Sequence, residues 1–282
     1  MRKIFITYGD DNYRESLVRI CREAEAAGVF DEVRAYTPDM LPEPFRGYTK
    51  AYRRGGGYWL WKPYVICDAL EKADEGDIIV YADAGCTVNS HRDWARYFDI
   101  LRRKDYIFFL TCTRTANYCK RAVLDFFRSR AGGKPVSRFT GNQAWALGNQ
   151  VQATFMLVRK AAGNGITARW KELAEHRPDL FTDVSDGERH RESASFWEHR
   201  HDQAVLTGCV CTSGELSRCC LFVEKMEKIY PGGQALIASR ISPAHKNFSN
   251  ARHTPASATV KRLFSNPLRT AFFRLLCLCS RI

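Results

Sequence analysis

The chain has 282 residues, of which 45% are hydrophobic and 12% aromatic, enough to bury the core of one large domain or two small ones. It contains no run of about 18 or more apolar residues, which argues against a transmembrane helix. Its net charge of +12 favours an anionic partner: nucleic acid, a membrane surface or a phosphorylated substrate. The N-terminus turns polar by Gly9 and does not resemble a signal peptide, so we expect a cytoplasmic protein.

Strands and helices are expected to alternate through the first part of the chain. Pro38, Pro42 and Pro44 indicate a loop, and Gly28 suits a left-handed helix cap. This alternation predicts an α/β fold with a mostly parallel sheet flanked by helices, whose ligands lie at the C-terminal strand ends. The expected strands are 3–7, 31–36, 78–82 and 106–112, and the expected helices are 13–27, 62–72 and 94–103.

The second half is less regular, with helices expected at 118–129 and 166–174, a strand at 153–158 and a helix starting at 202. We place a domain boundary between 1–248 and 249–282, where a small, polar linker begins. Pro267 then opens a basic amphipathic C-terminal helix capped by Asn266. Residues 240–282 carry eight Lys or Arg and no acidic residue. Such a tail suits either an anionic membrane surface or docking on the protein body.

The chain contains 11 cysteines, an odd number without regular spacing, so a disulfide framework is not expected. Cys209, Cys211, Cys219 and Cys220 raise the alternative of a zinc site. Their spacing matches none of the common zinc-ligand patterns, and free thiols are ordinary core residues in a cytosolic protein.

Asp83 stands at the end of the apolar run Ile78-Ile79-Val80-Tyr81-Ala82. A buried strand of this kind can deliver a carboxylate to the ligand edge of a sheet. Such a carboxylate can coordinate a divalent cation, accept a hydrogen bond from a ribose hydroxyl, or cap the following turn. The small residues Ala84 and Gly85 leave room for a ligand beside it.

A glycine-rich segment, Gly55-Gly56-Gly57, precedes the helix expected at 62–72. Its exposed N–H groups, with Arg53, Arg54 and Lys62 nearby, suit a diphosphate at the start of a helix. Three glycines alone are a weak signal and match neither the Walker pattern nor the dinucleotide fingerprint.

A third polar group is the run His199-Arg200-His201-Asp202-Gln203. It can be a solvated helix cap, or Asp202 can act as a general base or bind a sugar hydroxyl while Arg200 or a histidine faces phosphate. His245 is a further candidate for phosphate or metal binding.

Together these segments resemble bacterial GT-A fold nucleotide-sugar glycosyltransferases of the capsule and O-antigen type. The resemblance rests on four strings in chain order: Ile6-Thr7-Tyr8-Gly9-Asp10, Gly55-Gly56-Gly57-Tyr58-Trp59-Leu60-Trp61-Lys62-Pro63, Ile79-Val80-Tyr81-Ala82-Asp83-Ala84-Gly85-Cys86, and His199-Arg200-His201-Asp202-Gln203.

The resemblance implies a Rossmann-like sheet that binds a nucleoside diphosphate sugar and transfers the sugar to an acceptor hydroxyl. Asp83 would match the first acidic residue of a metal-binding Asp-x-Asp element, and Asp202 and Gln203 would line the sugar pocket, with Asp202 and Asp83 as the catalytic pair. The implied nucleotide-sugar residues are Thr7, Tyr8, Gly9, Arg54, Gly56, Gly57, Lys62, Asp83, Ala84, Gly85, His199, Arg200 and Gln203.

The chain departs from that pattern at Gly85, where the family has its second acidic residue. Asp83, with help from His245 or from diphosphate oxygens, can still hold Mn²⁺ or Mg²⁺, and we favour this cofactor. Alternatively, Lys62 and the nearby arginines neutralise the leaving diphosphate without metal.

We therefore expect a glycosyltransferase for a surface polysaccharide, using an NDP-sugar donor and a lipid-linked glycan acceptor. The basic tail would bring it to the inner face of the cell membrane, at about 1 kcal/mol per Lys or Arg. A basic nucleic-acid-binding module is the first alternative, although two thirds of the surplus charge lies in the tail and no nucleic-acid motif occurs. A catalytically silent GT-A partner subunit is the second.

Overall fold

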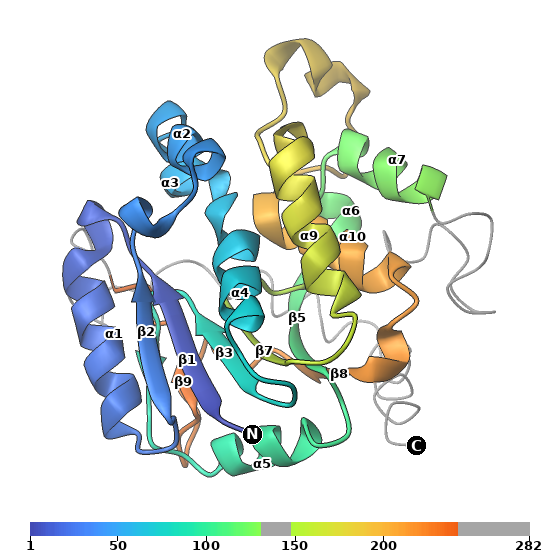
Figure 1. Cartoon of the computed structure of the whole chain (residues 1–282). Coiled ribbons are helices and arrows are strands. Elements are labelled where there is room, and N and C mark those ends of the chain that lie inside the picture. The colour runs from blue at the N-terminus through green and yellow to red at the C-terminus, as the bar shows by residue number, and fades with distance from the viewer. Residues whose placement is uncertain (131–147, 242–282) are drawn as a thin grey trace.

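The computed structural model describes residues 1–130 and 148–241, which form an α/β fold (Figure 1). Within these residues, seven strands form the central sheet in the order β2-β1-β3-β7-β5-β6, with β8 paired to β5. The strands of this sheet are β1 (Lys3–Tyr8), β2 (Glu32–Tyr36), β3 (Ile78–Ala82), β5 (Tyr106–Arg114), β6 (Asn149–Val151), β7 (Phe155–Arg159) and β8 (Cys219–Val223).

Five of these seven strands run in one direction, because β2, β1 and β3 are mutually parallel, β8 is parallel to β5, and only β7 and β6 oppose their neighbours. The predicted α/β class with a mostly parallel, helix-flanked sheet is therefore confirmed. A second, two-stranded sheet pairs β4 (Thr87–Val88) with β9 (Leu236–Ile237).

Helices cover both faces of the sheet. The main helices are α1 (Arg14–Ala26), α2 (Glu43–Ala51), α4 (Trp61–Glu71), α5 (Asp93–Ile100), α7 (Arg121–Arg130), α9 (Gly165–His176) and α10 (His201–Thr212). The remaining turns are α3 (Gly55–Tyr58), α6 (Thr115–Tyr118), and the 3-10 turns η1 (Asp11–Tyr13), η2 (Pro38–Met40), η3 (Pro178–Leu180), η4 (Asp186–Arg191) and η5 (Leu216–Arg218).

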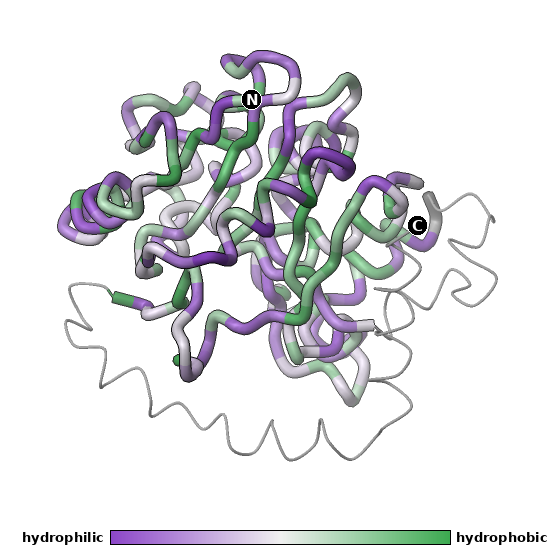
Figure 2. The backbone as a smooth tube through the Cα atoms, turned by 90° about the horizontal axis from the view of Figure 1, so that it is seen from below, coloured by the Kyte–Doolittle hydropathy of each residue, from purple (hydrophilic) through white to green (hydrophobic). Residues whose placement is uncertain are grey.

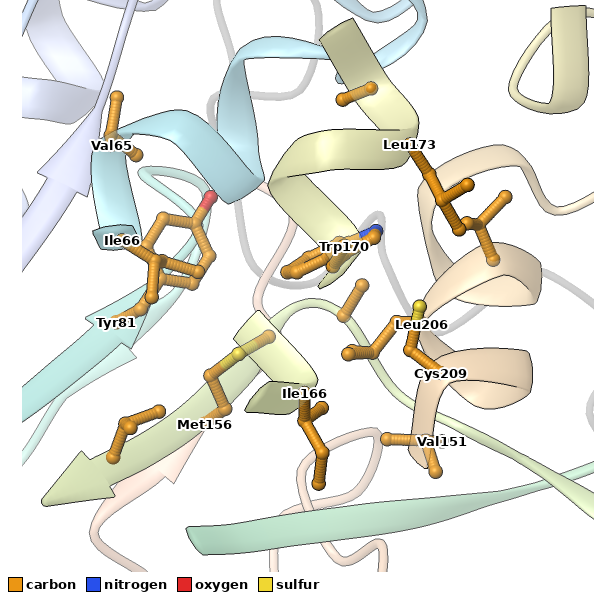
Figure 3. Close-up of a cluster of buried hydrophobic side chains, with 14 of the residues drawn as sticks. Val65, Ile66, Tyr81, Val151, Met156, Ile166, Trp170, Leu173, Leu206 and Cys209 are labelled. Atoms are coloured by element: carbon orange, nitrogen blue, oxygen red, sulfur yellow. The ribbon is translucent and has the colours of Figure 1, made fainter. Parts of the chain in front are cut away.

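Alternation along the strands divides the core into two layers. Ile4 and Ile6 of β1 pack with α4, α9 and α10, whereas Phe5 between them packs with α1 and α5. Figure 3 shows the first layer, where Trp170 of α9 lies between α4 and α10. Figure 2 shows hydrophobic segments running through the interior and hydrophilic ones on the outer turns.

Most expected elements are present with their ends shifted by a few residues, and strand 78–82 is found as predicted. The loop expected around the three prolines is wrong in part. Pro38 begins η2, and Pro42 precedes α2, whose first turn contains Pro44. Proline is accepted in a first helical turn because its missing N–H has no intrahelical partner there.

Two further expectations concern the later part of the chain. Strand β8 was not expected, although it is parallel to β5 along five residue pairs. The basic helix expected after Pro267 and the linker at 249–259 lie outside the described residues. Among the helices of the described residues, none is both long and apolar enough to cross a membrane.

The buried Trp170 offers a test of the first core layer. Its side chain is fully buried, so Trp170→Ala removes a large apolar group and leaves a cavity. We expect the free energy of unfolding in urea to fall by about 3–5 kcal/mol. Trp197→Ala is the matched control, because Trp197 is 56% exposed and its loss should change stability by less than about 0.5 kcal/mol. Equal losses for the two variants would contradict this packing.

Candidate functional site

The C-terminal edge of the parallel strands brings two of the predicted segments together. Because β1 and β3 are parallel with Ile6 beside Tyr81, the ends of both strands lie at the same edge of the sheet. Tyr8 stacks on Trp61 of α4 with ring centroids 3.8 Å apart. The buried hydroxyls of Thr7 and Tyr8 have no hydrogen-bond partner among the described residues, so this edge has polar capacity for a ligand.

A buried lysine joins the three predicted segments at this edge. Lys62 Nζ lies 3.1 Å from Asp83 Oδ1 and 2.7 Å from Asp202 Oδ2, and its side chain is only 3% exposed. The Tyr81 hydroxyl donates to Asp83 Oδ1 at 2.6 Å. The ammonium also lies over the rings of Trp61 and Tyr81. We call Lys62, Asp83 and Asp202 the lysine–carboxylate cluster.

The protonation of this cluster follows from burial and charge. Burial by itself lowers the pKa of Lys62, but attraction to Asp202 and Asp83 outweighs it and raises that pKa above its usual value. Burial raises the pKa of Asp202; Lys62 opposes this rise and the charge of Asp83 adds to it. Burial also raises the pKa of Tyr81, with Asp83 adding to the effect, so the hydroxyl stays a donor.

The glycine segment forms an unusual turn before α4. Gly55, Gly56, Gly57, Tyr58 and Trp59 all have positive φ, between 53° and 97°. The turn is closed by bonds from Tyr58 N to the Arg54 carbonyl and from Trp59 N to the Gly55 carbonyl. Only glycine adopts this conformation without strain, which explains three in succession.

This left-handed turn presents two aromatic rings to the start of α10. Tyr58 and Trp59 lie with ring centroids 5.1 and 5.3 Å from the His201 ring. Asp183 accepts hydrogen bonds from the Tyr58 hydroxyl and from Arg54. The glycine segment therefore packs against the residue next to Asp202, and α4 begins where Lys62 can reach both carboxylates.

In the run at 199–203, the two histidines are held against backbone carbonyls, whereas Asp202 contacts Lys62. His201 Nδ1 lies 2.7 Å from the Phe181 carbonyl oxygen, and His199 Nε2 lies 2.8 Å from that of Leu180. Burial lowers the pKa of His199 well below its usual value, so its ring is neutral. Gln203 donates to the Gln150 side chain at 2.6 Å.

Several predicted nucleotide-sugar residues do not join the lysine–carboxylate cluster. Arg54 is bound to Asp183, and Arg200 pairs with Glu198 and lies over the Tyr118 ring. His199 has a structural role rather than the phosphate-facing one we expected, because it is buried against backbone. Backbone groups near the strand ends are also hydrogen-bonded: Gly9 N donates to the Tyr36 carbonyl, and the Gly85 carbonyl accepts from Ile241 N. The Ala84 carbonyl accepts from the Arg19 side chain. Gly56 lies close to Asp10.

The described residues fit a divalent cation poorly. Asp83 Oδ1 is already engaged by Tyr81 and Lys62, position 85 has no side chain, and Asp202 is paired with the same ammonium. In residues 1–130 and 148–241, no group of three or more His, Cys, Asp or Glu side chains could hold a metal ion. Within the same ranges, Cys209, Cys211 and Cys219 are free thiols. His245 lies outside the described residues, so Mn²⁺ or Mg²⁺ binding by Asp83 and His245 stays a prediction.

Three residues near the site were not assigned a role from the sequence. Tyr81 orients Asp83, Gln150 holds Gln203, and Asp183 joins the glycine turn to His201. Tyr81 could have been found, because it lies two residues before Asp83 on the same strand. Gln150 and Asp183 lie in segments without a local motif, and only the tertiary contacts reveal them.

The comparisons with known proteins come from solved structures alone, since no family model and no curated protein matches the chain. It is similar to a glycosyltransferase involved in the glycosylation of the major capsid of PBCV-1, at 11% identity and a TM-score of 0.35 over 63% of this chain and 68% of that one. It is also similar to the galactosyltransferase LgtC, in complex with donor and acceptor sugar analogs, at 14% identity and a TM-score of 0.40 over 94% and 96% of the chains. Mouse xyloside xylosyltransferase 1 is a third such structure, at 14% identity and a TM-score of 0.35 over 79% and 85%.

Gly57→Ala tests the left-handed turn. Gly57 has φ of 97°, and a Cβ there would lie 2.9 Å from the backbone of Tyr48 and Thr49. We expect the free energy of unfolding to fall by more than the roughly 1–2 kcal/mol of left-handed strain alone. Gly76→Ala is the matched control, because Gly76 has φ of 87° and nothing within 4 Å of the new Cβ. Losses no larger at Gly57 than at Gly76 would argue against the close backbone approach.

His201 gives the protein a pH-dependent stability. Burial lowers its pKa to about 4, so below about pH 6.5 the unfolded chain binds a proton that the folded protein does not. Stability should therefore decrease as pH falls from about 6.5 to 4, by at most about 1.4 kcal/mol per pH unit from this group. In His201→Asn, which tolerates the positive φ of this position, urea unfolding should show a shallower pH slope. An unchanged slope would mean that the pKa of His201 is not lowered in the folded protein.

Proposed function

We infer that this protein is a GT-A fold glycosyltransferase that moves a sugar from a nucleoside diphosphate sugar to an acceptor hydroxyl. The observation that carries the proposal is the lysine–carboxylate cluster. It unites Lys62, Asp83 and Asp202, which come from three separate segments of the sequence, at the C-terminal edge of the parallel strands. This edge is where α/β sheets of this kind bind ligands.

The donor would lie across the ends of β1 and β3. The hydroxyls of Thr7 and Tyr8, which have no hydrogen-bond partner in residues 1–130 and 148–241, suit the nucleoside. Asp83 is 31% exposed and so remains accessible to a ribose or sugar hydroxyl. Gln203 and Asp202, at the first turn of α10, would border the sugar.

In the proposed reaction the acceptor oxygen bonds to the anomeric carbon of the sugar. The bond between that carbon and the diphosphate oxygen breaks, and the nucleoside diphosphate leaves with both bonding electrons. The acceptor proton passes to a base. Asp202 is the candidate base for an inverting reaction, because burial raises its pKa and a higher pKa makes a stronger base. In a retaining reaction Asp202 would be a pocket residue only.

The acceptor we propose is a lipid-linked glycan of a surface polysaccharide, as in the capsule and O-antigen type. The support is the basic composition of residues 240–282, which suits anionic headgroups. The location would then be cytoplasmic and peripheral at the inner face of the membrane. Removing residues 249–282 should weaken binding to anionic vesicles while leaving transfer to a soluble acceptor in place.

Two alternatives differ from this function in what they bind. A nucleic-acid module would bind RNA with a steep salt dependence and would bind no sugar nucleotide. A catalytically silent partner subunit would bind a nucleoside diphosphate but release no nucleotide from any donor. Gly85, in place of a second acidic residue, is the feature that favours the silent subunit.

Asp83→Asn tests the proposed function directly. With a panel of NDP-sugars and glycan acceptors, we expect nucleotide release from the unaltered protein and a fall of about 10²–10³-fold in kcat for the variant. The thermal unfolding midpoint should show that the variant is folded.

Asp125→Asn is the control, since Asp125 is an exposed residue of α7 that pairs with Arg121 and Arg128 of the same helix. It should keep full activity. No nucleotide release with any donor would refute the enzyme, and an active Asp83→Asn protein would refute the site.

A further inference from the structure

We propose that the Lys62 ammonium takes the place of a divalent cation in this site, so that the nucleoside diphosphate is bound and released without metal. This inference rests on the proposed function for its ligand, but the position of the ammonium is a property of the chain itself. The glycine at position 85 leaves two possibilities open: a metal ion held by Asp83, or neutralisation of the diphosphate by basic side chains. The inference favours the second.

The first argument is position. A Mg²⁺ ion lies about 2.1 Å from a carboxylate oxygen. Lys62 Nζ already lies 3.1 Å from Asp83 Oδ1, and Tyr81 donates to the same oxygen. A metal at that oxygen would place two cations at one carboxylate, and they would repel each other. A metal at Asp83 would also lack a set of three or more His, Cys, Asp or Glu ligands in residues 1–130 and 148–241.

The second argument is the missing carboxylate. Position 85 is glycine, and the chain around Arg240 and Ile241 lies against it, with Ile241 N donating to the Gly85 carbonyl at 3.0 Å. A Cβ built on Gly85 would meet Arg240 and Ile241 at 3.5 Å, which is ordinary contact. The backbone therefore leaves room for a small side chain at position 85, and the second carboxylate is missing because this residue is glycine.

The third argument is charge and burial. The Lys62 side chain is enclosed by two carboxylates and the rings of Trp61 and Tyr81. An unpaired ammonium would be costly in such a place, whereas this one is neutralised twice. The positive charge is therefore a permanent part of the site, within ion-pair distance of both Asp83 and Asp202.

The consequence for the ligand is a change in the role of the carboxylates. Paired with Lys62, Asp83 and Asp202 act as hydrogen-bond acceptors for ribose or sugar hydroxyls rather than as metal ligands. Lys62 is 3% exposed, so it is a positioning residue that acts through these carboxylates. Its charge also reduces the repulsion between the two carboxylates and the departing diphosphate.

The test is Mn²⁺ binding followed by electron paramagnetic resonance at mildly alkaline pH, with and without UDP, GDP or CDP. For the unaltered protein we expect no protein-bound Mn²⁺ that depends on Asp83, so its spectrum should match that of Asp83→Asn. Lys62→Met leaves the two carboxylates without their ammonium, so we expect this variant to bind Mn²⁺. The bound Mn²⁺ should be lost again in Lys62→Met/Asp83→Asn. A merely structural lysine would not produce this gain.

Lys120→Met is the matched control. Lys120 is also buried, but its ammonium is bound to the backbone carbonyls of Asp179 and Thr182. This variant should gain no Mn²⁺. Asp83-dependent Mn²⁺ binding by the unaltered protein would overturn the proposal. A folded Lys62→Met protein without Mn²⁺ binding would equally overturn it.

Calorimetry with the same nucleotides, in EDTA and in Mn²⁺, separates this inference from the proposed function. We expect the protein to bind the nucleotide with equal affinity in EDTA and in Mn²⁺. A nucleotide affinity that is higher in Mn²⁺ than in EDTA would overturn the inference. If no nucleotide binds in either condition, the proposed function fails, while the Mn²⁺ measurement still decides whether Lys62 takes the place of the cation.

Discussion

The pairing of one buried ammonium with two carboxylates is the interaction on which the site depends. Lys62 and Asp202 come from the first turns of α4 and α10, and Asp83 directly follows β3. Lys62 and Asp202 are 3% and 9% exposed, and each would be costly to bury charged without its partner. The cluster therefore holds three elements of different sequence origin in one arrangement. Tyr81 adds a hydrogen bond that fixes Asp83 from within its own strand.

The left-handed turn at Gly55–Tyr58 makes this pairing possible. It directly precedes α4, so that Lys62 enters the site from the first turn of that helix while Trp59 packs on His201. The strain at Tyr58 and Trp59 is retained because surrounding contacts over-determine it, as is common at functional sites. Asp183 accepts hydrogen bonds from Arg54 and Tyr58 at this turn and lies near His201, so it joins the turn to the start of α10.

The two-layered core gives these elements a rigid base. Trp170 and its neighbours join α4, α9 and α10 over one face of the sheet (Figure 3). Because α4 and α10 carry Lys62 and Asp202, packing in this layer sets the distance between them. Lys62 and Asp202 thus stand on helices and Asp83 directly follows a central strand, which favours precise positioning of the carboxylates.

The sequence by itself determined the strand before Asp83, the helix after the glycines and the mostly parallel α/β class. It also determined the three polar segments that contain Lys62, Asp83 and Asp202. Each of these follows from a local signal: apolar periodicity, glycine conformation, or charge at the end of a strand. Only the tertiary structure decided that Lys62 neutralises both carboxylates, that His199 and Arg54 are held by other partners, and that β7 and β6 run antiparallel. These outcomes depend on contacts between residues tens of positions apart, whose energy comes from packing and desolvation, and no local pattern records which partner a charged side chain will meet.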